Sequence, residues 1–392
     1  MPDAHNHRYR FGLDTFLRIG SSGPKLHRRA VQAHVGVCRD TQCGASSDSE
    51  ETMTKRRVLL AISISFALAL TARGQNATPL KLVQKIPMPN VQDRLDHLGV
   101  DVPGKRLFVA ALGDKQNTVE VVDLKSNQRT ASIPGQSKPQ GIFYSVDFKR
   151  LFVANGTDGT CKIFAGDTLK PINSFPVGDD ADHVGYDPAT KYLYIGTGDA
   201  KSGALVVVDT RTGVKIGQIK TDARPGGIKF DKSNPQIYVT LTGTSKLGVL
   251  DRKRREQVTG WAVPGVPGNV ALAIDEKHHR LFAGSRMPPL LTVLDTDTGK
   301  TITQIEGVDG IDDLWYDAAH QRIYASGGRG FDVGNVYVYQ QTGADQYKLA
   351  GKIPTAPGAG TSLWVPEFNR FFVAAPASDN QEAQLLVFEP QQ

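Results

Sequence analysis

Three pairs of adjacent residues, each beginning with an aspartate, carry the side chains best suited to chemistry in this sequence: Asp96-His97, Asp182-His183 and Asp312-Asp313. Imidazole nitrogens and carboxylate oxygens are common ligands of divalent metal ions, so His97, His183 and Asp313 could share one ion. The same groups could instead bind a small polar ligand or transfer a proton. A purely structural interpretation also stands, because an Asp often caps a turn through its own backbone and a His can simply be hydrated.

Three arginines complete the candidate ligand-binding set. Arg94 and Arg224 precede two of the strands expected below, and Arg329 lies in a glycine-rich run, residues 327–330. A planar guanidinium binds carboxylate or phosphate groups in a forked geometry, so an anionic ligand is one interpretation and surface charge is the other. No helix is expected after the glycine-rich run, which excludes a dinucleotide-binding turn. We expect a flexible loop there.

A repeated pair, one apolar and one aromatic residue, indicates how these side chains are positioned. It occurs seven times: Leu107-Phe108, Leu151-Phe152, Leu193-Tyr194, Ile237-Tyr238, Leu281-Phe282, Ile323-Tyr324 and Phe371-Phe372. The second members of successive pairs are 44, 42, 44, 44, 42 and 48 residues apart. One short β-type run precedes each pair and two follow it, with Gly, Asp, Asn and Thr at the boundaries. Four short strands every ~40–45 residues are typical of a propeller blade.

The two ends of the repeat region predict how the ring closes. The seventh repeat stops after its third strand, at Phe388-Glu389-Pro390, and residues 80–86 offer the missing fourth strand. Pairing these ends would remove the exposed sheet edges. The sequence therefore predicts an all-β, seven-bladed β-propeller of four-stranded antiparallel blades over residues 75–392.

Alignment of the blades on the repeated pair places the candidate residues where the innermost strands begin. These strands line the central channel of a propeller, and ligands usually bind at its mouth. The seven positions are Asp96-His97, Gln140-Gly141, Asp182-His183, Gly226-Gly227, Val270-Ala271, Asp312-Asp313 and Thr361-Ser362. Because two blades use only Gly, Val and Ala there, the repeat itself does not require a polar residue.

Short segments of the repeat resemble a known family. Residues 152–155 (Phe-Val-Ala-Asn) and 238–241 (Tyr-Val-Thr-Leu) are similar to the Tyr-Val-Thr-Asn signature of YVTN-type propellers. Residues 207–213 and 293–299 resemble the Val-Asp-Thr…Gly turn of the same repeats. The resemblance spans residues 80–390 and implies a surface or periplasmic propeller of the WD-repeat/YVTN-like kind. It implies a fold rather than a function, because propellers include binding modules, scaffolds and enzymes.

Residues 53–74 have the features of a secretory signal peptide. A basic segment follows Met53, an apolar run covers residues 58–70, and small residues stand before Gln75, where we expect cleavage. The apolar run would span about 20 Å as a helix, too short for a bilayer core of roughly 30 Å, so no transmembrane span is expected in the mature chain. Residues 1–52 show neither helical nor strand periodicity, and we interpret them as a non-native or disordered extension.

The net charge of +6 belongs mostly to this leader. Of 46 basic and 40 acidic residues, 11 and 6 lie in residues 1–74, which leaves 35 and 34 for the rest. A nearly neutral domain gives no support for a nucleic-acid partner. Only Cys161 follows the expected cleavage point, so an internal disulfide is excluded for the mature chain.

Two classes of function are compatible with these features. The leading hypothesis is a periplasmic or secreted monomer that binds a protein or a small polar ligand at the channel mouth. The alternative is a metal-dependent hydrolase or lactonase that uses axis-facing Asp and His residues, by analogy with propeller enzymes that hold an axial metal. No cofactor is identified, although a divalent metal is compatible with these residues. A haem- or quinone-bearing propeller is a third possibility, and the sequence lacks a haem-attachment motif.

Overall fold

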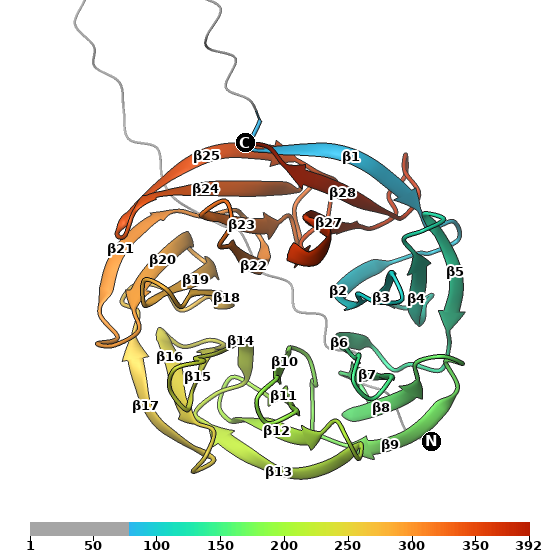
Figure 1. Ribbon diagram of the computed structural model, residues 1–392, viewed down its shortest axis with the longest axis horizontal. Coiled ribbons are helices and arrows are strands. Elements are labelled where there is room, and N and C mark those ends of the chain that lie inside the picture. Colours follow the sequence, from blue (N-terminus) through green and yellow to red (C-terminus); the bar gives the residue numbers. More distant parts are fainter. Residues whose placement is uncertain (1–77) are drawn as a thin grey trace, which may run out of the picture. The chain divides into compact units, whose positions relative to one another are not determined.

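The computed structural model describes residues 78–392, which form seven four-stranded antiparallel sheets arranged as a ring (Figure 1). The extension expected over residues 1–52, the signal peptide expected over 53–74 and the cleavage point before Gln75 lie outside the described residues. The fold is a seven-bladed β-propeller, which confirms the predicted fold class.

Each blade runs from an innermost strand at the channel to an outermost strand at the rim. Blades one to three contain β2 (Arg94–Asp101), β3 (Arg106–Leu112), β4 (Asn117–Asp123) and β5 (Gln128–Ile133); β6 (Pro139–Ser145), β7 (Arg150–Asn155), β8 (Thr160–Ala165) and β9 (Pro171–Pro176); and β10 (Val184–Asp187), β11 (Tyr192–Gly198), β12 (Gly203–Asp209) and β13 (Val214–Thr221). Blades four and five contain β14 (Pro225–Phe230), β15 (Gln236–Leu241), β16 (Lys246–Asp251) and β17 (Glu256–Ala262); and β18 (Asn269–Asp275), β19 (Arg280–Arg286), β20 (Pro289–Asp295) and β21 (Thr301–Glu306). Blade six contains β22 (Ile311–Asp317), β23 (Arg322–Gly327), β24 (Asn335–Gly343) and β25 (Gln346–Pro354). Blade seven contains β26 (Ser362–Val365), β27 (Arg370–Ala375), β28 (Gln384–Pro390) and β1 (Leu80–Pro87), with a 3-10 helix over Pro366–Phe368.

The strand sequences explain this order within a blade. The third strands are continuous runs of β-branched and aliphatic residues, such as β12, and both of their faces are buried. The fourth strands alternate polar and apolar residues, as in β25, and none of its nine residues is fully buried. A strand covered on both faces belongs in the middle of a blade, and a half-polar strand belongs at the rim.

Strand β1 closes the ring, as predicted. It pairs antiparallel with β28, in a register that joins Leu80 to Pro390 and Ile86 to Leu385 (Figure 1). Leu80, Ile86 and the following Met88 are each 2 % exposed or less. The N-terminal strand therefore contributes core side chains as well as backbone hydrogen bonds to the last blade.

The repeated aromatic residue packs blade against blade. Phe108 of blade one stacks on Tyr144 of blade two, with ring centroids 5.5 Å apart. Tyr324 of blade six lies 5.4 Å from Trp364 of blade seven, also between centroids. A large ring at this position fills the wedge between neighbouring sheets, which explains why the repeat retains it.

An aspartate at the end of several innermost strands holds the turn that follows. In blade six, Asp317 accepts hydrogen bonds from the backbone N–H groups of Ala319 (3.1 Å) and His320 (3.2 Å). Its second oxygen accepts from the buried hydroxyl of Tyr324 at 2.8 Å, and burial beside this carboxylate raises the pKa of Tyr324. This geometry links the turn to the core.

Replacing Asp317 with Ala is expected to destabilise the domain by about 2–3 kcal/mol, because it leaves the buried Tyr324 hydroxyl without a partner. The matched control is Asp251→Ala, which removes an Asp that caps only an exposed turn through Lys253 and Arg254. That change should cost about 1 kcal/mol or less. Urea unfolding of the two variants measures the difference, and equal losses would contradict a role for the Tyr324 contact.

The loop expected at the glycine-rich run is found between two strands of blade six. The basic run 252–255 forms the turn between β16 and β17, and residues 328–334 form a loop between β23 and β24. Cys161 is fully buried in β8, and burial raises the pKa of its thiol to about 12, which suits a packing role. The 3-10 helix is the only helical segment among residues 78–392, and no described helix has the length and apolar character required to cross a membrane.

Candidate functional site

The candidate residues gather at the end of the channel where the innermost strands begin, which we call the N-terminal mouth. Register shifts interrupt five of the innermost strand pairs near this end, at Leu95/Leu98, Pro139/Ile142, Pro225/Ile228, Asn269/Ala271 and Ile311/Asp313. A β-bulge re-aims side chains, and here it lets neighbouring residues face the axis. The structure brings Asp96-His97, Asp182-His183 and Asp313 together at this end of the channel.

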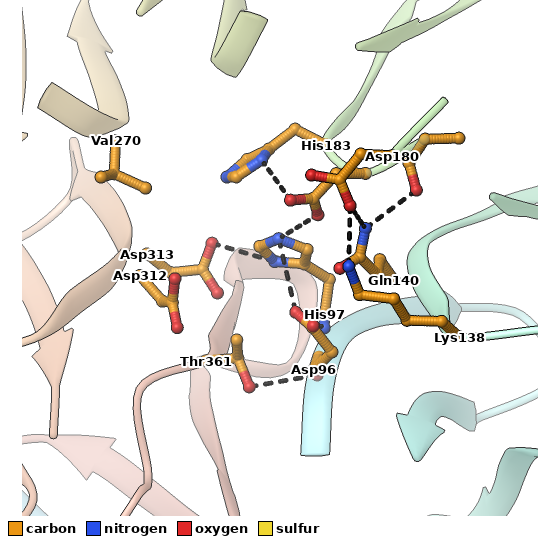
Figure 2. Close-up of polar contacts among 12 residues, drawn as sticks. Asp96, His97, Lys138, Gln140, Asp180, His183, Val270, Asp312, Asp313 and Thr361 are labelled. Atoms are coloured by element: carbon orange, nitrogen blue, oxygen red, sulfur yellow. Dashed lines mark hydrogen bonds and ion pairs between the residues drawn. The ribbon is translucent and has the colours of Figure 1, made fainter. Parts of the chain in front are cut away.

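His97 occupies the centre of this cluster (Figure 2). Its Nε2 atom lies 3.5 Å from Asp182 Oδ1 and 3.7 Å from Asp96 Oδ1, and its Nδ1 atom lies 3.4 Å from Asp313 Oδ1. Only 12 % of the His97 side chain is exposed. Three carboxylates from three blades therefore surround one imidazole.

This surrounding charge controls the protonation of His97. Burial lowers the pKa of His97, but the charge of Asp313 and the contacts with Asp182 outweigh burial and hold that pKa well above 6.5. Burial likewise raises the pKa of Asp182 and Asp313, yet the neighbouring imidazoles bring the pKa of both carboxyls below its usual value. The site strongly favours a positive charge at the position of His97.

Within residues 78–392, His183 and Asp182 keep buried polar atoms that make no hydrogen bond. The ring centroids of His97 and His183 are 4.5 Å apart at an angle of 60°, and His183 Nδ1 lies 3.6 Å from Asp182 Oδ2. Both ring nitrogens of His183 and the Oδ1 atom of Asp182 are buried and accept or donate no hydrogen bond to any described residue. Buried polar groups of this kind usually have a partner, so an additional group at this point is indicated.

Asp313 is held in place from blade seven. Its Oδ2 atom accepts a hydrogen bond of 2.8 Å from the backbone N–H of Ser362, while Oδ1 faces His97. The donor atoms of His97, Asp182 and His183 all lie within 4.8 Å of one another, and this group does not include Asp313. The sequence named His97, His183 and Asp313 as the metal candidates; the structure places Asp182 in the group and Asp313 behind His97.

Arginines form the outer part of the mouth. Arg94, the first residue of β2 rather than a loop residue as expected, is ion-paired with Asp96. Arg286 is ion-paired with Asp312 and also donates from Nε to a backbone carbonyl at 2.7 Å. Arg329 Nη1 lies 3.3 Å from the same Asp312 oxygen. Arg94 and Arg329, which the sequence suggested, thus reach the site, and so does Arg286, which it did not.

A second group of charges lies between blades two, three and four. Arg224 Nη1 contacts Asp182 Oδ2 at 2.9 Å and Asp180 Oδ2 at 3.1 Å. Lys138 Nζ lies 2.8 Å from Asp180 Oδ1, and Gln140 donates to the same oxygen at 3.4 Å (Figure 2). These contacts connect three blades across the mouth and hold Arg224 against Asp182.

The arginines crowd one another. Burial lowers the pKa of Arg286 to about 10, and the charge of Arg329 adds to this effect. The pKa of Arg329 is also lowered, first by burial and then by the charge of Arg94. An anion bound between these groups would relieve their repulsion.

Arg286 is the functional candidate that sequence reasoning missed, although a signal was present. It is the last residue of β19, the second strand of blade five. The second strands of the other six blades end in uncharged residues: Leu112, Asn155, Gly198, Leu241, Gly327 and Ala375. A comparison of strand ends across blades would therefore have identified Arg286.

A cavity of about 230 Å³ extends from the mouth along the axis. His97, His183 and Asp313 line it at the mouth, and Lys229 and Trp315 line it further along the innermost strands. Lys229 Nζ lies 4.9 Å from the centre of the Trp315 ring, and burial lowers the pKa of Lys229. The volume is below the range of roughly 300–1,000 Å³ typical of sites for drug-sized ligands, so the channel suits a small molecule or ion.

Comparison with known proteins supports the fold and leaves the family open. No family model matches this chain, and no curated protein matches it. One chain in a crystal structure of the mitotic checkpoint complex is similar, with 14 % identity and a TM-score of 0.66 over 92 % of this chain and 100 % of that one. A chain of Kuenenia stuttgartiensis hydrazine synthase has 16 % identity and a TM-score of 0.62, over 76 % and 97 % respectively. At these identities the similarity shows a WD40-like propeller fold alone, and the YVTN-type repeat remains a prediction.

Proposed function

We propose that this protein is an exported binding module that takes a small anionic ligand at the N-terminal mouth. The observation that carries this proposal is the layered arrangement of charge there. The side chains of Arg286 and Arg329 are 31 % and 38 % exposed, whereas that of Asp312, their shared partner, is 7 % exposed. A ligand that approaches Asp312 therefore meets the two guanidinium groups before it meets the carboxylate.

The arginines retain donors for such a ligand. A guanidinium has five N–H groups in a planar fork. Within residues 78–392, Arg94 and Arg329 each use one terminal nitrogen on a carboxylate, and Arg224 uses Nη1 on two carboxylates. The free edges of these groups can accept a carboxylate or phosphate in two-point contacts, while the buried aspartates hold the guanidiniums in position.

The charge balance limits how tightly such a ligand is held. Five Lys and Arg side chains at the mouth face five carboxylates, namely Arg94, Lys138, Arg224, Arg286 and Arg329 against Asp96, Asp180, Asp182, Asp312 and Asp313, and the raised pKa of His97 adds only one further positive charge. Affinity must therefore come from local geometry rather than from a net positive field, and the partly exposed arginines make it sensitive to salt. A compact anion with two or more carboxylate or phosphate groups fits the spacing of charges offered by the arginines, none of which lines the 230 Å³ cavity.

The double change Arg286→Gln and Arg329→Gln is expected to weaken anion binding at least tenfold, about 1.4 kcal/mol, because each arginine offers charge-assisted hydrogen bonds. Isothermal titration of the purified protein with inorganic phosphate, citrate and malonate at low salt measures this. Arg254→Gln is the matched control, since Arg254 lies in the β16–β17 turn and its side chain is 69 % exposed. Lack of binding by every anion, or equal affinities in the two variants, would contradict the proposal.

Export and a protein partner are proposed from the sequence and from the fold class. Export rests on residues 53–74 and on the resemblance of the repeat to YVTN-type propellers, and a monomer remains an expectation. A protein partner at the same mouth is compatible with a propeller, and an acidic peptide segment would offer the same chemistry as a small anion. The hydrolase or lactonase alternative requires a bound metal as well as a substrate, and it stays a second candidate.

A further inference from the structure

We propose that His97, Asp182 and His183 bind one divalent transition-metal ion at the base of the N-terminal mouth, with Asp313 and Arg224 as positioning residues. This metal site does not depend on the anion-binding function proposed above. It differs from the set expected from the sequence, because Asp182 replaces Asp313 as the carboxylate ligand.

The distances within the group favour shared coordination over direct hydrogen bonding. The contact between His97 Nε2 and Asp182 Oδ1 measures 3.5 Å, longer than the 2.7–3.2 Å expected for an N–H···O hydrogen bond, and the 3.6 Å contact of His183 Nδ1 is with the other oxygen, Oδ2. Ligand atoms at about 2.0–2.1 Å from a tetrahedral ion are separated by roughly 3.3 Å. All three donor atoms lie within 4.8 Å of one another, so a small inward movement of the two rings would complete the site.

Buried polar atoms that make no hydrogen bond are a second observation in favour of the metal site. Asp182 Oδ1 and both ring nitrogens of His183 are buried and have no hydrogen-bond partner among residues 78–392. Leaving such atoms without a partner is costly, and these three belong to two adjacent residues. One ion placed between the two rings would satisfy Asp182 Oδ1 and one nitrogen of His183 together.

The neighbouring residues are arranged to orient these ligands. Asp313 Oδ1 faces the Nδ1 atom of His97, which leaves Nε2 directed toward Asp182, and the Ser362 N–H fixes Asp313. Arg224 holds Asp182 by its Oδ2 atom and leaves Oδ1 free. A carboxylate behind a ligating imidazole and a donor on the second carboxylate oxygen are the usual outer contacts of metal ligands.

Asp96 is excluded as a ligand by its own contacts. Its Oδ1 atom accepts a 3.0 Å hydrogen bond from the His97 backbone N–H, and its Oδ2 atom is paired with Arg94. Three protein ligands thus remain, and the rest of the coordination sphere opens to the cavity that His97 and His183 line. A site with three ligands and an open position binds exchangeable water or a ligand group.

The donor set selects the class of ion. Two imidazoles and one carboxylate suit Zn²⁺, Fe²⁺ or Co²⁺, whereas Ca²⁺ and Mg²⁺ take oxygen ligands almost exclusively. The three carboxylates around His97 supply the negative charge that compensates a divalent ion. Zinc and cobalt are therefore the metals with which to test the site, and calcium is the ion that should not bind.

The test titrates the full chain with Zn²⁺ and Co²⁺ after dialysis against a chelator. The chain contains other His and Cys residues outside residues 78–392, so the signal is the difference between wild type and His183→Gln. We expect His183→Gln to abolish one equivalent of bound metal and the visible Co²⁺ absorption, and Asp313→Asn to weaken binding about 10- to 100-fold. His279→Gln is the matched control, because His279 is half exposed on the opposite mouth.

Two further readouts separate metal binding from a structural role. The His183 side chain has no hydrogen-bond partner among residues 78–392, so His183→Gln should melt within a few degrees of wild type without metal and should lose the stabilisation that Zn²⁺ gives the wild type. Identical Co²⁺ spectra and zinc stoichiometry in wild type and His183→Gln would overturn the proposal. Stabilisation by Ca²⁺ but not by Zn²⁺ or Co²⁺ would overturn it too.

Discussion

Deletion of residues 78–88 is expected to abolish cooperative folding of the ring or to lower its melting temperature by more than any single substitution. The deletion removes β1 and leaves the outer edge of β28 unpaired, while β27 still pairs with the other edge. It also removes the buried side chains of Leu80, Ile86 and Met88, and truncation of one such residue to Ala typically costs about 2–5 kcal/mol. The exposed edge would in addition favour aggregation.

A milder pair of variants keeps this prediction testable if the deleted protein aggregates. Ile86→Ala should destabilise by about 2–5 kcal/mol, because Ile86 is fully buried between blades seven and one. Leu82→Ala on the same strand should change stability by less than about 0.5 kcal/mol, since Leu82 is 41 % exposed. Urea unfolding measures both. An unchanged midpoint for Ile86→Ala would show that β1 does not close the ring.

The second large effect is expected from Gly141→Ala in β6. Gly141 occupies in blade two the position that His97 and His183 occupy in blades one and three. A Cβ atom there would lie 2.0 Å from the carbonyl oxygen of Asp182 and 2.6 Å from Val184 Cγ1. Since a backbone atom cannot rotate away, Asp182 must move. We expect a loss of about 1–3 kcal/mol in stability together with weaker Co²⁺ binding.

Gly260→Ala in β17 is the control for this substitution. Its nearest neighbour, a methylene of Lys246, would lie 3.5 Å from the new Cβ, which is ordinary contact. The control should therefore leave both stability and metal binding close to wild type. Equal results for Gly141→Ala and the control in calorimetric melting and in the Co²⁺ titration would show that blades two and three do not approach each other closely at Gly141.

The part of the fold that repeats could be predicted from the sequence. An isolated blade cannot bury its two faces, so each repeat must keep the same aromatic wedge and the same β-branched middle strand. The aromatic pairs such as Leu107-Phe108 therefore appear at regular spacing, and the shortfall of one strand in the last repeat pointed to residues 80–86. The positions of Asp96-His97 and Asp182-His183 at one level of the ring followed from the same alignment.

The contacts within the site could not be predicted in this way. Whether Asp182 or Asp313 lies between the two imidazoles depends on the bulges in the innermost strands and on the angles between blades, which no repeat spacing encodes. Arg286 was missed because it ends a second strand, far in sequence from the aligned positions. Partner identity, export and repeat family remain predictions for the same reason, since the fold is shared by proteins of many functions.

For this protein the sequence by itself determined the number of blades, the order of strands and the set of residues that begin the innermost strands, because these depend on local periodicity and on burial that each repeat must satisfy. Tertiary structure alone decided which charges pair, which buried atoms lack partners and how small the channel is. Those properties depend on side chains from blades one, three, four, five and six that meet only when the ring closes.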